Sequence, residues 1–317
     1  MGRDAATGDV GRRGAELALV TVTHNSMLEL TRMLATVQRH LPEAEVVVVD
    51  CASGDDSAAA AREWQDGRAT VLEPGVNLGY GRATNRGVAA VTRPVTVVAN
   101  PDIELLDAAL AALASEVARP GAPERILAPL VLRPDGSRQD SVHRHPTSPA
   151  ALVRALLPPV ALPHGLRTAV EPWRADKPHR VAWAVGCCLV ARTDTLRRLG
   201  PFDERIFLYA EDTELGLRAA DLGVETWFRP EARVRHDSAH STAGAFGGEH
   251  RELLARQRRA VVQERLGPAR RRIDDWLQLV TFADRVVLKT IAGQPREREL
   301  RQLAALRRAR REPPRLV

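Results

Sequence analysis

One acidic side chain stands just beyond a short apolar run, Val95–Ala99, in the sequence Asn100-Pro101-Asp102. A run of this kind predicts a buried parallel strand, and Pro101 ends it because proline cannot donate to a strand ladder. We therefore expect Asp102 in a loop at the carboxyl edge of a sheet, where open α/β sheets bind ligands. A carboxylate there suits a hard divalent cation. The alternative is that the three residues form only a turn.

A second acid, Asp50, ends the apolar run Glu45–Val49 and is expected at the same sheet edge. An acid after the second strand of a nucleotide-binding unit often hydrogen-bonds the nucleoside. The alternative is a helix cap or an Asx turn.

Two adjacent acids, Glu211 and Asp212, open a predicted helix. At that place Asp212 could stay ionised and take a proton from an attacking hydroxyl group. The alternative is that both acids only complement the helix dipole.

Two histidines, His236 and His240, follow a predicted strand. Their spacing is not a zinc-protease motif, because Asp237 holds the second position and the segment leaves a strand instead of lying on a helix. His236 could bind the same cation as Asp102, and His240 could contact phosphate. The alternative for both is an ordinary surface histidine.

The glycine-containing segment Asn77–Gly81 precedes a predicted helix. It lacks the third glycine of a dinucleotide fingerprint and does not follow the first strand, which argues against an NAD oxidoreductase. A loop at a helix N-terminus can still lie close to a phosphate or nucleoside.

The elements that must position these residues alternate between strands and helices up to residue 120, which predicts an α/β fold with a mostly parallel sheet. Strands are expected at Leu17–Val22, Glu45–Val49, Ala69–Leu72 and Val95–Ala99, and helices at 27–39, 57–64, 80–91 and 106–117. A hairpin is expected from Ile126–Leu132 and Arg138–Val142, no regular structure at 143–180, a strand at Val181–Ala191, a helix at Glu211–Leu222, and short strands at Glu225–Phe228 and Val234–His236. The spacing of Ser26 and Glu29 predicts a capping box.

Positive charge is concentrated in the last part of the chain. Residues 249–317 hold 18 basic and 9 acidic residues, a net charge of +9, whereas the whole chain of 317 residues carries +6. The remainder is therefore at −3. The basic part has few aromatic residues, only Trp276 and Phe282, which argues against nucleic-acid binding. Three cysteines and no apolar signal segment favour a cytoplasmic protein with reduced thiols.

The order of these motifs resembles the inverting glycosyltransferases of family 2, which have the GT-A (Rossmann-like) fold. The chain is most similar to the rhamnosyltransferases that extend polyprenyl-diphosphate-GlcNAc in actinobacterial cell-wall assembly. The motifs that carry the resemblance are Asn77–Gly81, Val98–Asp102, Gly200–Arg205 with Glu211-Asp212, and His236–Thr242. It implies a flexible N-terminus at 1–15, a GT-A domain at 16–247 and a basic helical extension at 248–317.

The resemblance also assigns roles to single residues. Asp212 would be the catalytic base, and Asp102 with His236 would hold Mg²⁺ or Mn²⁺. Asp50 would bind the donor base. The other residues that it places at the substrates are Asn25, Asn77, Gly79, Tyr80, Asn100, Trp183, Gly186, Glu211 and His240. The donor that it favours is dTDP-L-rhamnose, and the acceptor is a glycan or a polyprenyl-diphosphate-linked glycan.

The chemistry of the residues agrees with this interpretation. A nucleoside diphosphate leaving group needs a cation, and single displacement needs one base on the acceptor hydroxyl. A double-displacement glycosidase would need two carboxylates flanking the bond and would leave the glycine loop without a use. The alternative function is a catalytically silent nucleotide-sugar-binding partner subunit.

An apolar stripe in the basic extension is formed by residues at helical spacing, namely Trp276, Val280, Ala283, Val287 and Ile291, and a second helix is expected at 296–311. The stripe either packs on the catalytic domain or lies on the inner face of the cell membrane, held by acidic lipids.

Overall fold

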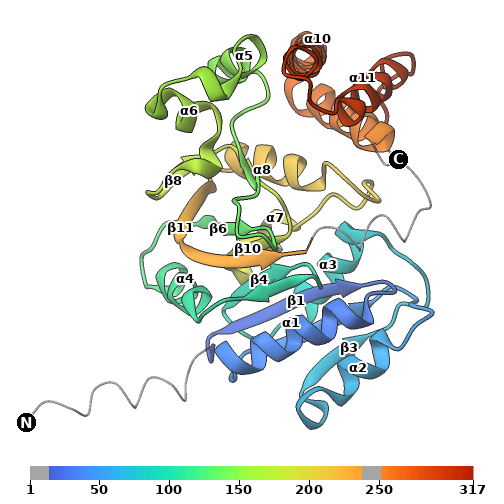
Figure 1. The fold of residues 1–317 in the computed structure, drawn as a ribbon. Coiled ribbons are helices and arrows are strands. Elements are labelled where there is room, and N and C mark those ends of the chain that lie inside the picture. Colours follow the sequence, from blue (N-terminus) through green and yellow to red (C-terminus); the bar gives the residue numbers. More distant parts are fainter. Residues whose placement is uncertain (1–13, 238–250, 317) are drawn as a thin grey trace, which may run out of the picture.

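The computed structural model describes residues 14–237 and 251–316. A central sheet lies between helices, and a group of helices covers one end of it (Figure 1). The first half alternates as predicted: β1 Leu17–Thr23, α1 Met27–His40, β2 Glu45–Asp50, α2 Ser57–Glu63, β3 Ala69–Leu72, α3 Tyr80–Ala90, β4 Val95–Ala99, β5 Ile103–Leu105 and α4 Ala109–Ala118. The second half contains β6 Arg125–Leu132, β7 Val142–His143, α5 Pro149–Leu156, α6 His164–Val170, β8 His179–Val181, β9 Trp183–Ala184, β10 Cys188–Arg192, α7 Thr193–Leu199, α8 Glu211–Asp221, β11 Glu225–His236, α10 Arg251–Ile291 and α11 Glu297–Ala309.

The main sheet has the strand order β3-β2-β1-β4-β10-β6-β11-β5, with β8 paired to β11. Strands β1 to β4 run parallel to their neighbours, whereas β10 runs antiparallel to β4, with Cys188 opposite Ala99. The start of β10 therefore meets the end of β4. This arrangement brings the loops that carry the candidate residues to one edge of the sheet.

Apolar side chains of the sheet pack against apolar side chains of the helices that cover it. The inner face of α1 contributes Leu30, Met33, Leu34 and Val37, which are all buried. The predicted capping box is wrong. The Ser26 hydroxyl donates to the His24 carbonyl and caps no helical N–H group.

Three other expectations about the second half are wrong. The hairpin is reduced to one bridge between Leu132 and Arg138, because β6 pairs with β10 and β11 instead. The segment 143–180 contains α5 and α6. The expected strand Val181–Ala191 is divided between β8, β9 and β10.

A further correction concerns β11, which is one strand of 12 residues and not two short ones. Its register to β6 shifts between Arg229 and Arg233. Pro230 lies at this irregularity, where a proline does not interrupt a regular ladder. The bulge lets the strand continue to His236 at the functional edge.

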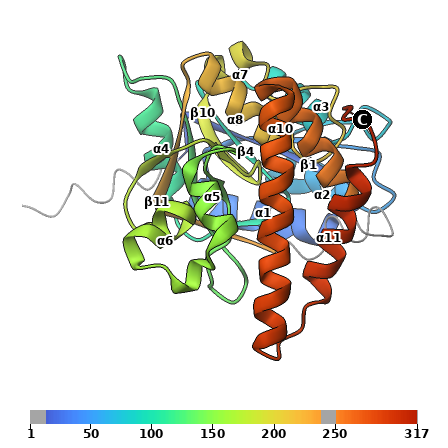
Figure 2. The same ribbon diagram turned by 90° about the horizontal axis from the view of Figure 1, so that it is seen from above.

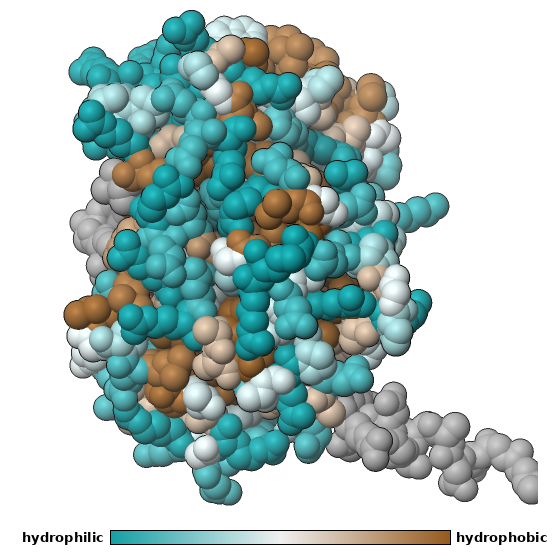
Figure 3. Space-filling view, turned by 180° about the vertical axis from the view of Figure 1, so that it is seen from behind, coloured by the Kyte–Doolittle hydropathy of each residue, from teal (hydrophilic) through white to brown (hydrophobic). Residues whose placement is uncertain are grey.

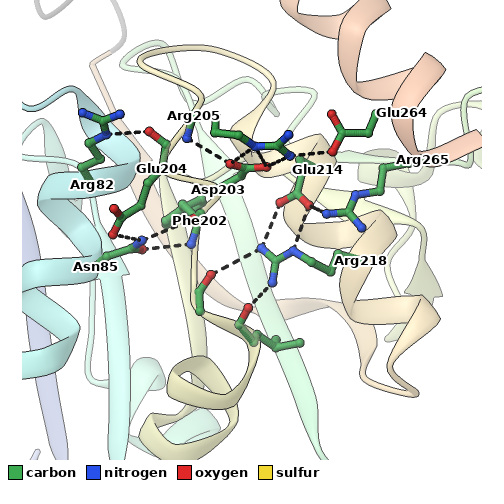
Figure 4. Close-up of polar contacts among 12 residues, drawn as sticks. Arg82, Asn85, Phe202, Asp203, Glu204, Arg205, Glu214, Arg218, Glu264 and Arg265 are labelled. Carbon is green, nitrogen blue, oxygen red and sulfur yellow. Dashed lines mark hydrogen bonds and ion pairs between the residues drawn. The ribbon is translucent and has the colours of Figure 1, made fainter. Parts of the chain in front are cut away.

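Helix α10 packs against the catalytic domain through its first half. Arg265 forms an ion pair with Glu214 of α8, and Glu264 pairs with Arg205 at 2.5 Å (Figure 4). A left-handed Gly267 (φ +85°) and Pro268 then divide α10 into two helical parts. The second part extends past α5 on one side and α11 on the other (Figure 2). Within the described ranges, no helix has the length and apolar character needed to span a bilayer.

Candidate active site

The loops after β1 and β2 form one end of the site. Asp50 is buried, and its Oδ2 accepts a hydrogen bond from the Ser53 N–H group at 3.0 Å. Its Oδ1 is also buried and accepts no hydrogen bond from the part of the chain that the structure describes. The Asn25 side chain accepts from the Gly54 N–H group at 2.6 Å, so it shapes the loop beside Asp50. A buried carboxylate oxygen without a donor is suited to the imide N–H of a nucleobase.

The glycine loop packs against the segment that precedes α8. Gly79 has φ +76°, and a Cβ atom there would lie 2.3 Å from the Phe207 carbonyl oxygen, so this position requires glycine. Asn77 accepts from the Gly79 N–H group at 2.9 Å. Tyr80 donates from its hydroxyl group to the Gly186 carbonyl at 2.7 Å. The loop is therefore joined directly to the start of β10.

Asp102 and His236 meet at the sheet edge, with the Nε2 atom of His236 3.1 Å from Asp102 Oδ1. The other ring nitrogen, Nδ1, lies 3.1 Å from the Oε1 atom of Gln139, which fits an Nδ1–H donor. That hydrogen bond leaves the Nε2 lone pair on the side of Asp102. The Asn100 amide lies 3.5 Å from the same Nε2 atom.

This pair fits a divalent cation that is completed by substrate. Two neighbouring ligands of an octahedral ion at 2.0–2.1 Å lie about 3 Å apart, close to the observed separation. Among the described residues no group of three or more His, Cys, Asp or Glu side chains is positioned to hold a metal ion. Mg²⁺ commonly takes only one or two protein ligands and completes its coordination with substrate phosphates and water.

The acids at the start of α8 are close to the other side of the site. Burial raises the pKa of Glu211 to about 8, and the charge of Asp212 adds to the shift. Burial also raises the pKa of Asp212, although the N–H groups of Thr213 and Gly186 lower it in part. We infer that Glu211 holds a proton at neutral pH and Asp212 carries the charge, because both cannot ionise easily at this spacing. The expectation that the helix N-terminus alone controls Asp212 is incomplete.

Arg258 of α10 is a site residue that the sequence did not indicate. Its guanidinium binds both carboxylate oxygens of Asp274, at 2.9 and 2.8 Å. Its charge also acts on Asp212 and opposes the rise in the pKa of that carboxyl group. Nothing in the local sequence distinguishes Arg258 from the other arginines of the extension.

An aromatic wall formed by Trp183 and His143 packs against α8, the helix that begins with the two acids. Trp183 stacks on His143 with ring centroids 4.0 Å apart. A Cβ atom at Gly216 would lie 2.3 Å from the Trp183 Cβ atom, so α8 packs tightly against this wall. Burial lowers the pKa of His143 to about 3, with repulsion from Arg154 and Arg258 adding to the shift. His143 is therefore neutral, and the sequence interpretation did not include it.

Most of the predicted residues thus lie along one edge, from Asp50 through Asp102 to Asp212. Cys187 and Cys188, at the start of β10, are buried free thiols between them. His240 lies outside the described residues, as do the predicted boundary at 247/248 and most of the predicted N-terminal segment 1–15.

Comparison with known proteins identifies the class of this site. The family model for glycosyl transferase family 2 matches residues 18–146. The chain is 34% identical over 244 residues to the N-acetylglucosaminyl-diphospho-decaprenol L-rhamnosyltransferase of Mycobacterium tuberculosis, covering 71% of this chain and 77% of that protein. The chain belongs to glycosyl transferase family 2 and is a glycosyltransferase.

Solved structures confirm the predicted GT-A fold. The mannosyltransferase of Pyrobaculum calidifontis, in complex with GDP-Man and Mn²⁺, aligns with a TM-score of 0.59 at 17% identity, covering 93% of this chain and 86% of that one. GalNAc-T7 with UDP, GalNAc and Mn²⁺ aligns with a TM-score of 0.56 at 18% identity. That alignment covers 78% of this chain, which spans 47% of the GalNAc-T7 chain.

Proposed function

We propose that this protein transfers L-rhamnose from dTDP-L-rhamnose to polyprenyl-diphospho-GlcNAc, with inversion at the sugar carbon. The observation that carries the proposal is the 34% identity to a rhamnosyltransferase of this acceptor class, along a chain whose base and metal positions are both filled. These filled positions argue against a catalytically silent partner subunit.

Asp212 acts as the general base in this proposal. It takes the proton of the attacking GlcNAc hydroxyl group while the glycosidic bond to the donor diphosphate breaks. The raised pKa of Asp212 makes it a stronger base, and protonated Glu211 beside it adds no competing charge. Its hydrogen bond from the Thr213 N–H group, at 2.6 Å, holds the carboxylate in position.

Asp102 and His236 would hold Mg²⁺ or Mn²⁺, and the cation would neutralise charge on the nucleoside diphosphate leaving group. Asp50 accepts the imide N–H of the donor base through its unpaired Oδ1 atom, in a pocket bordered by Asn25. Thymine and uracil share this group, so the preference for dTDP comes from the similarity to the relative. In this proposal the path between donor and acceptor is lined by the remaining predicted residues, namely Asn77, Gly79, Tyr80, Asn100, Trp183, Gly186 and Glu211.

We also propose that the protein binds peripherally to the inner face of the cell membrane. The predicted stripe of α10 is at the surface, with Trp276 49%, Val287 55% and Ile291 79% exposed. This exposure argues against the alternative that the stripe packs on the catalytic domain. Basic residues flank the stripe, which suits an acidic lipid surface.

The experiment is a transfer assay with purified full-length protein, Mn²⁺ and GlcNAc-diphospho-polyprenol, offering dTDP-L-rhamnose, UDP-GlcNAc and GDP-mannose separately. We expect mass spectrometry to detect an added deoxyhexose with the first donor only. Transfer from another donor would overturn the rhamnosyl assignment. No transfer from any donor would overturn the acceptor assignment.

A further inference from the structure

Helices α5 and α10 lie side by side at one end of the molecule, and α10 also contacts α8, the helix that begins with Glu211 and Asp212 (Figures 1 and 2). Arg270 of α10 donates a hydrogen bond to the hydroxyl group of Thr147, just before α5, at 3.3 Å. Residues far apart in the sequence therefore form one surface here. The argument below rests on the proposed acceptor class.

The first observation is an arginine on α5 without an acid partner. The guanidinium of Arg154 stacks over Trp173 at 5.1 Å from the ring centroid. Its Nε atom is buried without a hydrogen-bond acceptor, and no carboxylate in the described part of the chain forms an ion pair with it. A buried guanidinium N–H group without an acceptor is costly, so its retention indicates a ligand that brings negative charge.

The second observation is that other guanidinium groups of α10, the helix that contacts α5, lie near Arg154. Burial lowers the pKa of Arg154, and repulsion from Arg285 lowers it further; Asp140 and Glu171 act in the opposite direction, and repulsion from Arg258 is the smallest contribution. Arg258 is neutralised by Asp274. Arg285 stacks over Phe282 at 5.2 Å and, within the described ranges, forms no ion pair. Two unneutralised guanidiniums therefore lie near each other.

The third observation is an exposed apolar surface on both helices beyond these arginines. Its most exposed members are Leu152 (43%), Leu156 (50%), Leu157 (49%) and Val160 (76%) on and after α5, and Leu288 (40%) and Ile291 (79%) on α10. The opposite face of the molecule, seen from behind, carries scattered apolar side chains among mostly hydrophilic ones (Figure 3). Along the second part of α10, Arg285 thus lies between Asp274, the partner of Arg258, and the exposed Leu288 and Ile291.

We propose that Arg154 and Arg285 bind the diphosphate group of the lipid-linked acceptor, and that the prenyl chain leaves over the apolar surface of α5 and α10. A diphosphate offers several charged oxygens to planar guanidinium forks, which favour two-point contacts. The GlcNAc unit then lies toward Asp212 and the aromatic wall of Trp183 and His143. The order of charges and apolar side chains on the surface matches the order of groups in the acceptor.

The first test measures binding of farnesyl diphosphate to full-length protein by isothermal titration calorimetry, without donor or transfer. We expect Arg154→Gln and Arg285→Gln each to weaken binding by about tenfold or more, because each removes a charge-assisted contact. Arg154→Lys keeps the charge but loses the fork and should fall between. The matched control is Arg272→Gln, which removes an exposed arginine of the same helix.

Probe chemistry separates the possible anions. Farnesol lacks the diphosphate group and should not bind measurably. Inorganic diphosphate lacks the prenyl chain and should bind more weakly than farnesyl diphosphate. Equal binding of inorganic and farnesyl diphosphate would overturn the role of the apolar surface. Unchanged binding in both arginine variants, with melting temperatures like the wild type, would overturn the site itself.

A kinetic arm keeps this inference separate from the proposed function. In the transfer assay the two variants should raise KM for the lipid acceptor, whereas the KM for donor stays unchanged. Arginine-dependent binding of farnesyl diphosphate by an enzyme that cannot rhamnosylate the lipid would leave the site intact and reject the proposed reaction. Normal rhamnosylation, with a KM for the lipid acceptor that neither arginine substitution changes, would support the proposed reaction and reject the arginine site.

Discussion

The Nε2 atom of His236 lies 3.1 Å from Asp102 Oδ1, although one residue ends β11 and the other follows β4. The Gln139 side chain fixes the ring by its contact with Nδ1. In the proposed function, two ligands held in this way would prepare a cation site before the substrate arrives, and the diphosphate and water would supply the remaining positions.

Metal removal tests this relationship. EDTA should abolish transfer, and Mn²⁺ or Mg²⁺ should restore it. Asp102→Asn should lower the rate and weaken Mn²⁺ binding, measured by electron paramagnetic resonance with donor present. Asp135→Asn, in an exposed turn, is the matched control. Full transfer in EDTA would reject the metal role of both residues.

Asp212→Asn should lower the transfer rate by roughly 10²- to 10⁴-fold, the usual contribution of a general base. Donor affinity, measured by calorimetry, should stay close to that of the wild type because the amide keeps the size of the side chain. Asp221→Asn, at the exposed end of the same helix, should change neither quantity. Turnover near the wild-type level in Asp212→Asn would assign the base elsewhere.

The pH dependence of stability should reveal the protonated Glu211. Its pKa is raised from 4.5 to about 8, so the folded state binds more protons than the unfolded state between these values. The free energy of unfolding should therefore fall as pH rises from about 4.5 toward 8. Glu211→Gln imitates the protonated acid and should flatten this part of the curve, followed by urea unfolding. A fall that is equally steep in the variant would show that Glu211 is ionised in the native protein.

Arg258 offers a test of how α10 contributes to catalysis. Its charge lowers the pKa of Asp212, so Arg258→Gln should move the acid limb of the rate profile to higher pH. Because the single change leaves Asp274 buried without its partner, Arg258→Gln with Asp274→Asn is the better variant. An acid limb at the wild-type pH in a folded double variant would restrict Arg258 to a structural role.

The sequence predicts the first half of the fold because its buried parallel strands are continuous apolar runs, as in Val95–Ala99. The sequence pattern predicts two short strands in place of β11, because Arg229, Pro230 and Glu231 interrupt the apolar residues. The burial pattern nevertheless alternates from Glu225 to His236, and this period of two was present in the sequence.

Candidate site residues can be selected from the sequence where they follow a strand or open a helix, as for Asp50, Asp102 and Asp212. Gln139, His143 and Arg258 were not predictable, because each enters the site through tertiary packing and has no local motif. The hairpin prediction is wrong for a related reason, because β6 pairs with β10 and β11, which are distant in the sequence. Local turn signals cannot reveal that competition.

Membrane binding is the last prediction, and the structure shows how to test it. Ending the chain at Gly267 would remove Asp274 and Asp275, which pair with the buried or part-buried Arg258 and Arg259. Such a truncation would confound membrane binding with misfolding. Point changes in the exposed stripe avoid this problem, because Trp276 and Ile291 are 49% and 79% exposed.

Each basic residue near an acidic membrane contributes about 1 kcal/mol to binding, and apolar insertion adds to this. We therefore expect full-length protein to co-sediment with anionic vesicles, and Trp276→Asp with Ile291→Asp to remain largely in the supernatant. The control is Leu222→Asp, an exposed apolar position just beyond α8. Equal sedimentation of the stripe variant and the control would reject the stripe as the membrane contact.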